Sequence, residues 1–341
     1  RSHDMSDVAQ DSGVRDWHLK QPFGWRSLLV LFMLLAVSLV SAERMQFDRM
    51  ASQIGDFALE TVGLRESSQI GRGMESVTRD MFPIAIAERR PIDLMDGLDE
   101  TELPFLSHIE TVDIETTELD PETLQMTTSV SERRFLVEPI GYLVFVLGKM
   151  VETIEIAIWA SLIAILVSLP LAWLCAGNYS PHPIIYAGAR SFVSLLRSIP
   201  ELISALFLVL AFGFGPIAGI LALTFHSIGF LAKFYAEDIE AANTSPQHAL
   251  KATGAGTFAI LRLAVLPQVL PSYTGLSLYI LDRNIRMATV IGLVGAGGIG
   301  QELKGRFDMF QYDRVGTMLL VIFLTVMALD VVSARFRNRL V

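Results

Sequence analysis

The sequence predicts an all-α fold: a polytopic membrane protein of about six transmembrane helices, with a helical cytoplasmic loop and an extracytoplasmic insert between helices 1 and 2. Hydrophobic residues make up 52% of the 341 residues and charged residues only 18%, a composition too apolar for a soluble domain of this length. Apolar segments of nearly membrane-spanning length recur along the chain. Basic residues gather beside these segments in the pattern that marks cytoplasmic loops.

A transmembrane helix needs about 20 predominantly apolar residues. Six segments approach that length: Trp25–Ala42, Met150–Ala176, Glu201–Phe214, Ile217–Tyr235, Gln268–Leu281 and Gly316–Val332. The third and fifth are short, so their helices are expected to extend further. We expect the first segment, residues 25–42, to be a retained span. It lacks a small-residue cleavage site, and the charged pair Glu43 and Arg44 follows it.

The basic residues near the predicted spans fall into three groups, which precede the first span, surround a central polar loop and close the chain. They are Arg15, Lys20, Arg26, Lys233, Lys251, Arg262, Arg335, Arg337 and Arg339. An even number of spans puts all three groups on one face, which the positive-inside rule assigns to the cytoplasm. Both termini are therefore predicted to be cytoplasmic. Residues 1–24 form the N-terminal tail, and residues 1–4 resemble an expression scar.

Residues 43–139 form an acidic insert that the same rule places outside the membrane. Residues 43–138 hold 21 Asp or Glu against 9 Arg and no Lys, a balance of 9 − 21 = −12. Because the whole chain has a net charge of −9, the remainder carries about +3, which argues against nucleic-acid binding. The insert is predicted to be a small cap domain or a partly ordered loop, and its sequence indicates no function.

A polar, helix-prone loop at residues 237–267 interrupts the apolar second half. Gly254 permits a tight turn after a short helix, and Pro267 is predicted to end a second helix. Such a helical knob fits a groove on another protein. The alternative is an ordinary solvated helix pair between two spans.

Four glycines, Gly295, Gly297, Gly298 and Gly300, satisfy the spacing G-x-G-x-x-G. A dinucleotide site would need a strand before them and an acidic residue about 20 positions beyond. Asp313 lies too near, and an apolar span follows instead of a second strand. The glycines are therefore predicted to form a break that lets helices cross closely at membrane depth.

The chain contains no Walker pattern, HExxH motif or catalytic triad order, and its single Cys175 excludes cysteine-based metal clusters. We therefore expect no enzyme activity, no metal and no cofactor in this chain. Any ATP-derived energy would have to come from another subunit.

Five polar residues on predicted spans are candidates for a translocation pathway: His226, Asp282, Arg283, Asn284 and Arg286. The last four are predicted at the outer end of span five. An unpaired charge inside a bilayer is costly, so these charges face a bundle interior or a watery cavity. Two interpretations remain open. Asp282 and Arg286 brace the helix as an i,i+4 pair, or the arginines form a cationic lining for an oxyanion.

The segment from Tyr279 to Gly300 resembles the fifth-span signature of phosphonate-type ABC importer permeases. Residues 251–255 and 265–271 are similar to the coupling loop of that family, written EAA, three residues, G, nine residues, I-x-L-P. The matching positions are Ala249, Gly254, Leu266 and Pro267, and the departures are His248, Leu250 and Ala264. The literal Glu240-Ala241-Ala242 is out of register, because Pro246 stands where the glycine belongs.

The resemblance implies an ABC permease domain over residues 140–341 with a coupling helix from Gln247 to Ala255 inside the 237–267 loop. It also implies a homodimer in the inner membrane that engages two ATPase subunits and an extracytoplasmic binding protein. ATP and Mg would then be bound by the ATPase, and the cargo would be phosphonate, phosphite or phosphate. Two alternatives are a secondary transporter driven by an ion gradient and a membrane scaffold or sensor without transport.

Overall fold

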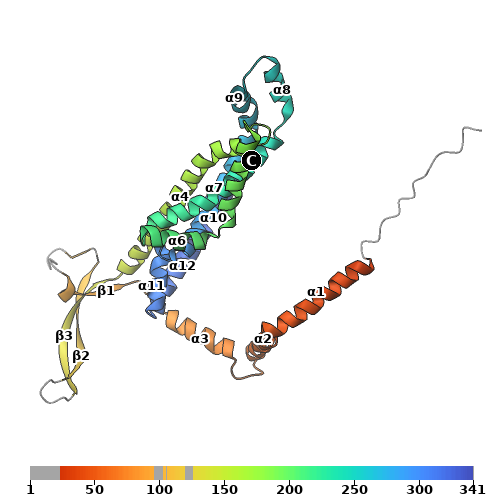
Figure 1. Ribbon diagram of the computed structural model, residues 1–341. Helices are drawn as coiled ribbons and strands as arrows, with labels where there is room; N and C mark the ends of the chain where they lie inside the picture. Colours follow the sequence, from red (N-terminus) through yellow and green to blue (C-terminus); the bar gives the residue numbers. More distant parts are fainter. Residues whose placement is uncertain (1–23, 96–102, 105, 120–125, 341) are drawn as a thin grey trace, which may run out of the picture. The chain divides into compact units, whose positions relative to one another are not determined.

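The computed structural model describes residues 24–95, 103–104, 106–119 and 126–340. The predicted tail at residues 1–24, with the expected scar at residues 1–4, therefore lies almost entirely outside the described residues. The chain divides into two compact units, residues 1–76 and 77–341. Long helices dominate the described chain (Figure 1), which confirms the predicted class of helical membrane protein.

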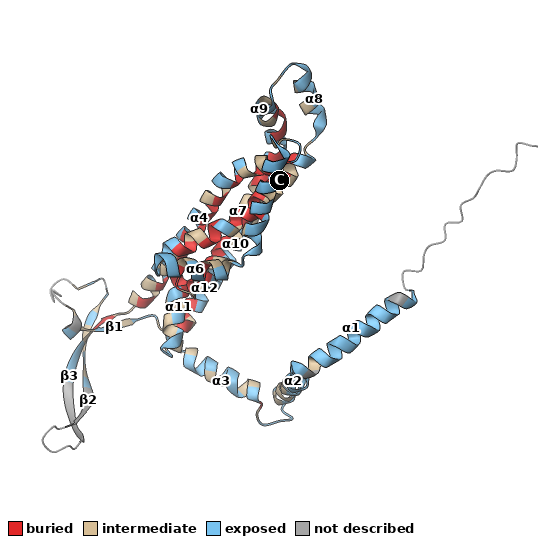
Figure 2. Cartoon of the chain, in the orientation of Figure 1, coloured by how far each residue is buried: buried red, intermediate tan, exposed pale blue. Residues whose placement is uncertain are grey.

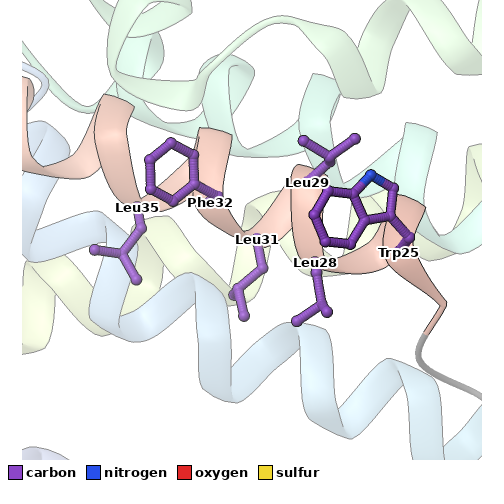
Figure 3. Close-up of a pocket in the computed structure, with 6 residues that line it drawn as sticks. All are labelled: Trp25, Leu28, Leu29, Leu31, Phe32 and Leu35. Atoms are coloured by element: carbon purple, nitrogen blue, oxygen red, sulfur yellow. The ribbon is translucent and has the colours of Figure 1, made fainter.

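The first unit contains α1 (Trp25–Arg44) and α2 (Phe47–Thr61), with Gln46 in the left-handed region (φ 56°) between them. Together they are long and apolar enough for one span, bent by 70°. Six exposed side chains stand along α1 and form an apolar surface (Figure 3): Trp25, Leu28, Leu29, Leu31, Phe32 and Leu35. A helix that is apolar on every side suits a lipid environment, as the predicted first span requires.

The insert contains a small antiparallel sheet, which sequence analysis did not predict. After α3 (Gln69–Met81), strands β1 (Glu88–Pro91), β2 (His108–Leu119) and β3 (Met126–Glu138) pair in the order β1-β3-β2. A short 3-10 helix, η1 (Ile92–Leu94), follows β1. The strands are rich in Thr, Val and Ile, which favour extended backbone. Polar residues are interspersed with apolar ones along these strands. Their hydrophobic signal is therefore much weaker than that of the apolar spans.

The second unit is a bundle of long helices. Four of them are long and apolar enough to cross a membrane: α4 (Gly141–Cys175), α7 (Pro216–Ala241), the run 257–292 that ends in α10 (Leu266–Gly292), and α12 (Tyr312–Leu340). Two shorter helices, α5 (Pro183–Ser198) and α6 (Glu201–Phe212), form a pair bent by 89°. If each bent pair is one span, the described residues contain up to six, the number predicted.

Small residues bring α4 and α7 together at the centre of the bundle. Figure 2 shows buried positions along the facing sides of α4, α7 and α10. The buried small residues on α4 and α7 include Ala157, Ala160, Ala164, Ala218, Gly219 and Ala222. Such residues let helix backbones approach closely where no hydrophobic force drives association. Outward-facing apolar side chains on the same helices stay exposed, as lipid contact requires.

The insert and the polar loop meet opposite ends of α4. Strand β3 ends three residues before α4 begins, and Ala85 and Ile86 of the insert hydrogen-bond to Thr317 and Leu143. At the other end, Gly177 follows α4 and contacts the end of α7 beside the polar loop. A helix of 35 residues is about 52 Å long, more than the roughly 30 Å of a hydrocarbon core.

The prediction that Pro267 ends a helix is wrong. Helix α9 (Thr257–Ile260), the π-turn η2 (Leu261–Val265) and α10 follow one another without a break. Pro267 lies in the first turn of α10. Proline is tolerated there because the π-turn already interrupts the regular i→i−4 hydrogen bonds. The missing N–H of Pro267 therefore removes no further helical hydrogen bond.

The charged cluster that the sequence placed at the outer end of span five lies inside a longer helix. Helix α10 continues six residues beyond Arg286, to Gly292. Asp282, Arg283, Asn284 and Arg286 therefore lie within the helix. The predicted segment ended too early because hydropathy falls at these charges. The structure shows that each charge has a partner on the same or a neighbouring helix, so the helix can continue.

Candidate functional site

The predicted knob is a separate short helix at one end of the bundle. Helix α8 (Thr244–Ala252) and α9 project beyond the long helices (Figure 1). Asn243 caps α8 by accepting a hydrogen bond from the Ser245 N–H at 2.9 Å. Gly254 has φ +83°, and the Ala255 N–H bonds to the Leu250 carbonyl at 3.2 Å. The helix thus ends three residues before the predicted limit at Ala255.

Two glutamine side chains tie the start of the knob to the bundle. The Tyr179 hydroxyl donates to Gln247 Oε1 at 2.7 Å, and the Asn243 N–H donates to Gln268 Oε1 at 3.0 Å. Burial raises the pKa of the Tyr179 phenol above its usual value, so this donor stays protonated. His248 and Ala249 are exposed, as are Leu266 and Pro267. The exposed pair on α8 is free to meet another protein.

Glu240 braces the base of the knob, a role that sequence reasoning missed. Its Oε1 accepts hydrogen bonds from the Gly177 N–H at 2.7 Å and from Arg190 Nη2 at 2.9 Å. Arg190 Nε donates in turn to the Cys175 carbonyl at 3.0 Å. The out-of-register Glu240 therefore joins the ends of α4 and α7 to α5. The available signal was Arg190 itself, a basic residue between the second and third predicted spans.

Two of the five pathway candidates, His226 and Arg283, meet at Glu201. Arg283 Nη2 donates to Glu201 Oε1, and His226 Nε2 lies 3.3 Å from the same oxygen. Arg283 on α10 has a side chain that is 26% exposed. The corresponding fractions are 16% for His226 on α7 and 13% for Glu201 on α6. Arg283 Nη1 is buried without a hydrogen-bond partner among the described residues. The sequence did not single out Glu201, which completes this charge cluster.

Asn284 has a different role from its neighbours, because it is buried among hydroxyl groups. Its Nδ2 donates to Ser161 Oγ at 2.9 Å and to Ser227 Oγ at 3.0 Å. These contacts join α10 to α4 and α7 at the centre of the bundle. Hydrogen bonds of this kind hold membrane helices together, so the geometry makes Asn284 a packing residue.

Asp282 and Arg286 form the i,i+4 pair that the sequence allowed. Arg286 Nη2 donates to Asp282, and Nη1 donates to Asp330 Oδ1 on α12 at 3.1 Å. Two carboxylates therefore surround one guanidinium, which gives a local formal charge of −1. This arrangement ties α10 to α12. It does not favour a cationic lining at Arg286.

The four glycines lie where α10 turns into α11 (Gly298–Asp308). Gly295, Gly297 and Gly298 have φ of +92°, +85° and +70°, values that side chains rarely tolerate. The Gly298 N–H donates to Glu152 Oε1 at 3.0 Å, and the Ile299 N–H donates to Thr153 Oγ1 at 2.8 Å. A helix precedes the glycines, and α4 already caps the first N–H groups of α11. Both facts exclude the dinucleotide interpretation.

Replacing Gly300 by Ala is expected to destabilise the bundle. A Cβ on Gly300 would lie 2.9 Å from Gly292 Cα, so α10 and α11 would have to separate. Overpacking of this kind costs about 1–3 kcal/mol. Thermal unfolding of the purified chain in detergent measures the loss. Gly305→Ala is the matched control on the same helix, because nothing lies within 4 Å of its Cβ position. Equal unfolding temperatures for the two variants would contradict the close-crossing interpretation.

Comparison with known proteins gives concordant results. Residues 168–341 match the family described as "Binding-protein-dependent transport system inner membrane component". HtxE of Stutzerimonas stutzeri, named as a phosphite transport system permease protein, is 52% identical over 261 residues, which cover 76% of this chain and all of HtxE. The phosphate-import permease PhnE of Mycolicibacterium smegmatis is 43% identical over 190 residues, 56% of this chain and 36% of PhnE.

Among solved structures, an inward-facing form of the MetNI methionine ABC transporter is similar to this chain, with a TM-score of 0.51. The match has 21% sequence identity and covers 57% of this chain and 96% of that chain. The likeness supports the helical bundle fold.

Proposed function

Because the chain belongs to the family of binding-protein-dependent transport system inner membrane components, we propose that it is the permease subunit for a phosphorus oxyanion: phosphonate, phosphite or phosphate. The identity of 52% across the full length of HtxE carries this proposal. The phosphate-import function in the name of PhnE supports the same class of cargo. The observations favour neither a secondary transporter nor a scaffold.

We further propose a homodimer whose two α8 helices each engage one ATPase subunit. The exposed His248 and Ala249 on α8 support this assignment, since such a helix fits a partner's groove. ATP and Mg would be bound by the ATPase alone. A binding protein would deliver cargo on the opposite side, near the acidic insert. Both termini would then be cytoplasmic, in agreement with the basic residues beside them.

The connections of α8 suggest how ATPase movement reaches the bundle. Gln268 lies in the first turn of α10, and its side chain accepts a hydrogen bond from Asn243, the residue before α8. Tyr179 links α8 to the turn after α4. A displacement of α8 would therefore act on both helices, and a tilt of α10 would move Arg283 relative to Glu201. We propose that this ion pair lies on the translocation pathway.

Arg283 is the best candidate for the cation that meets the cargo. A guanidinium binds planar pairs of oxygens through two parallel hydrogen bonds, and Arg283 Nη1 has no bond of its own among the described residues. Glu201 neutralises the guanidinium when no cargo is present. An arriving oxyanion would compete with Glu201 for the same donors.

Uptake by proteoliposomes tests the proposal. The chain is reconstituted with its ATPase, and the binding protein is loaded with radiolabelled phosphite, phosphate or a phosphonate. We expect uptake of at least one of these compounds that requires ATP hydrolysis and survives dissipation of ion gradients. Uptake that follows an ion gradient without ATP would instead indicate a secondary transporter. No flux of any of the three would contradict the assigned cargo class.

A further inference from the structure

A second group of cations surrounds a small cavity close to the base of the knob. The cavity has a volume of about 110 Å³ and is lined by Cys175, Arg190, Val193, Ser194, Arg197 and Lys233. These residues come from α4, α5 and α7. Three of the six are basic, one carries a hydroxyl group, and none is acidic. A cavity of roughly 10–15 Å³ is enough to hold one water, so a compact tetrahedral anion fits here.

The carboxylates around the cavity do not fully neutralise its three cations. Arg190 bonds to Glu240 at 2.9 Å and stacks over the Tyr186 ring at 5.1 Å. Lys233 Nζ lies 3.6 Å from Glu237 Oε1, beyond the range of a good hydrogen bond. Arg197 makes no ion pair with any described residue. Three positive charges thus face two carboxylates, which leaves a formal excess of one.

Close helix packing fixes the position of Arg197. A Cβ on Gly229 of α7 would lie 2.8 Å from Arg197 Cγ and 3.1 Å from the Arg197 backbone nitrogen. The absence of a side chain at Gly229 therefore lets α5 lie directly on α7. The stem of Arg197 lies against that helix, and its side chain lines the cavity with the other two cations.

We propose that this cavity is a binding site for a phosphate-class oxyanion, held by Arg197, Arg190 and Lys233 with a hydrogen bond from Ser194. Guanidinium groups and a hydroxyl are the donors that phosphate oxygens prefer. The same chemistry fits a free phosphorus oxyanion and the headgroup of an anionic phospholipid. The cavity lining includes no residue of the Arg283 cluster, and the site takes this class of anion whichever compound is transported. An anion here links α5 to α7 beside the Arg190–Glu240 brace.

Thiol protection tests the site directly. Ser194→Cys is made in a Cys175→Ser background, which leaves one thiol in the full-length chain, and its modification by N-ethylmaleimide is timed in lipid-depleted detergent. Inorganic phosphate at ten times its Kd is expected to slow modification about tenfold relative to chloride at equal ionic strength, from simple occupancy. The matched control is Ser198→Cys in the same background, because Ser198 does not line the cavity.

Charge variants and lipids identify the occupant. Adding Arg197→Gln is expected to remove the protection, and Arg197→Lys to retain part of it, whereas Arg335→Gln changes nothing. If phosphate has no effect but nanodiscs of phosphatidylglycerol slow modification and those of phosphatidylcholine do not, the occupant is a lipid headgroup at the proposed site. Three outcomes would overturn the inference. Neither phosphate nor phosphatidylglycerol protects the Ser194→Cys thiol, protection persists in Arg197→Gln, or Ser198→Cys is protected equally. None of these readouts involves uptake, so they stand apart from the transport assay.

Discussion

Arg283→Gln is expected to lower phosphorus oxyanion uptake about a hundredfold or more. The substitution removes the proposed cargo-binding cation and leaves Glu201 largely buried without its guanidinium partner. Truncating one partner of a buried charge pair at a binding site costs about 2–5 kcal/mol of binding free energy, and each 1.4 kcal/mol is a factor of about ten in binding. Uptake by proteoliposomes with a fixed amount of bound ATPase measures the effect.

A double variant separates binding from folding. Glu201→Gln combined with Arg283→Gln removes both charges, so the unpaired carboxylate and its cost disappear. We expect the double variant to unfold near the wild-type temperature but to remain inactive in uptake. Arg306→Gln is a matched control. Arg306 is outside the cluster and donates a hydrogen bond to Gln311 Oε1 at 3.0 Å. Recovery of uptake in the double variant would show that Arg283 serves the fold alone.

Gly254→Val is expected to reduce uptake about 10- to 100-fold while the chain stays in the membrane. Gly254 has φ +83°, and a β-branched residue there is strained by about 1–3 kcal/mol. Because nothing lies within 4 Å of its Cβ position, the effect comes from the backbone and not from a clash. The turn after α8 would change shape, and the bundle would not.

Gly256→Val is the control for this prediction. Gly256 also has open space around its Cβ position but adopts φ −70° and ψ 162°, which valine accepts readily. We expect Gly256→Val to retain uptake. Co-purification of the ATPase with each variant distinguishes lost docking from lost coupling. Equal uptake by the two variants would exclude a specific role for the turn at Gly254.

Four of the spans were predictable from sequence because each contains a long apolar run. The sheet over residues 88–138 was not predicted, since its polar, threonine-rich strands carry a weaker signal. Gly254 could be assigned to a turn from its spacing alone. The pairing of Glu201 with Arg283, 82 positions apart, depends on how α6 and α10 pack. A single sequence does not encode that contact in any local pattern.

The failed prediction at Pro267 has the same origin. Proline usually marks the end of a helix, but here the π-turn at 261–265 precedes it, and a π-turn has no recognisable local spacing. The role of Glu240 was likewise hidden. Its partners, Gly177 and Arg190, lie 63 and 50 positions away. The local sequence pattern therefore indicated which residues were unusual. The role of each depends on contacts with residues far away in the sequence.

The unbroken path from the π-turn into α10 makes that helix a lever arm. Arg283 lies 17 residues beyond Leu266, which is about 26 Å along the axis at 1.5 Å per residue. Pivoting the arm by about 10° at its base would swing the guanidinium sideways by about 4–5 Å, farther than the roughly 4 Å over which an ion pair persists. A rotation of about 10° at the base of α10 would therefore break the ion pair between Arg283 and Glu201.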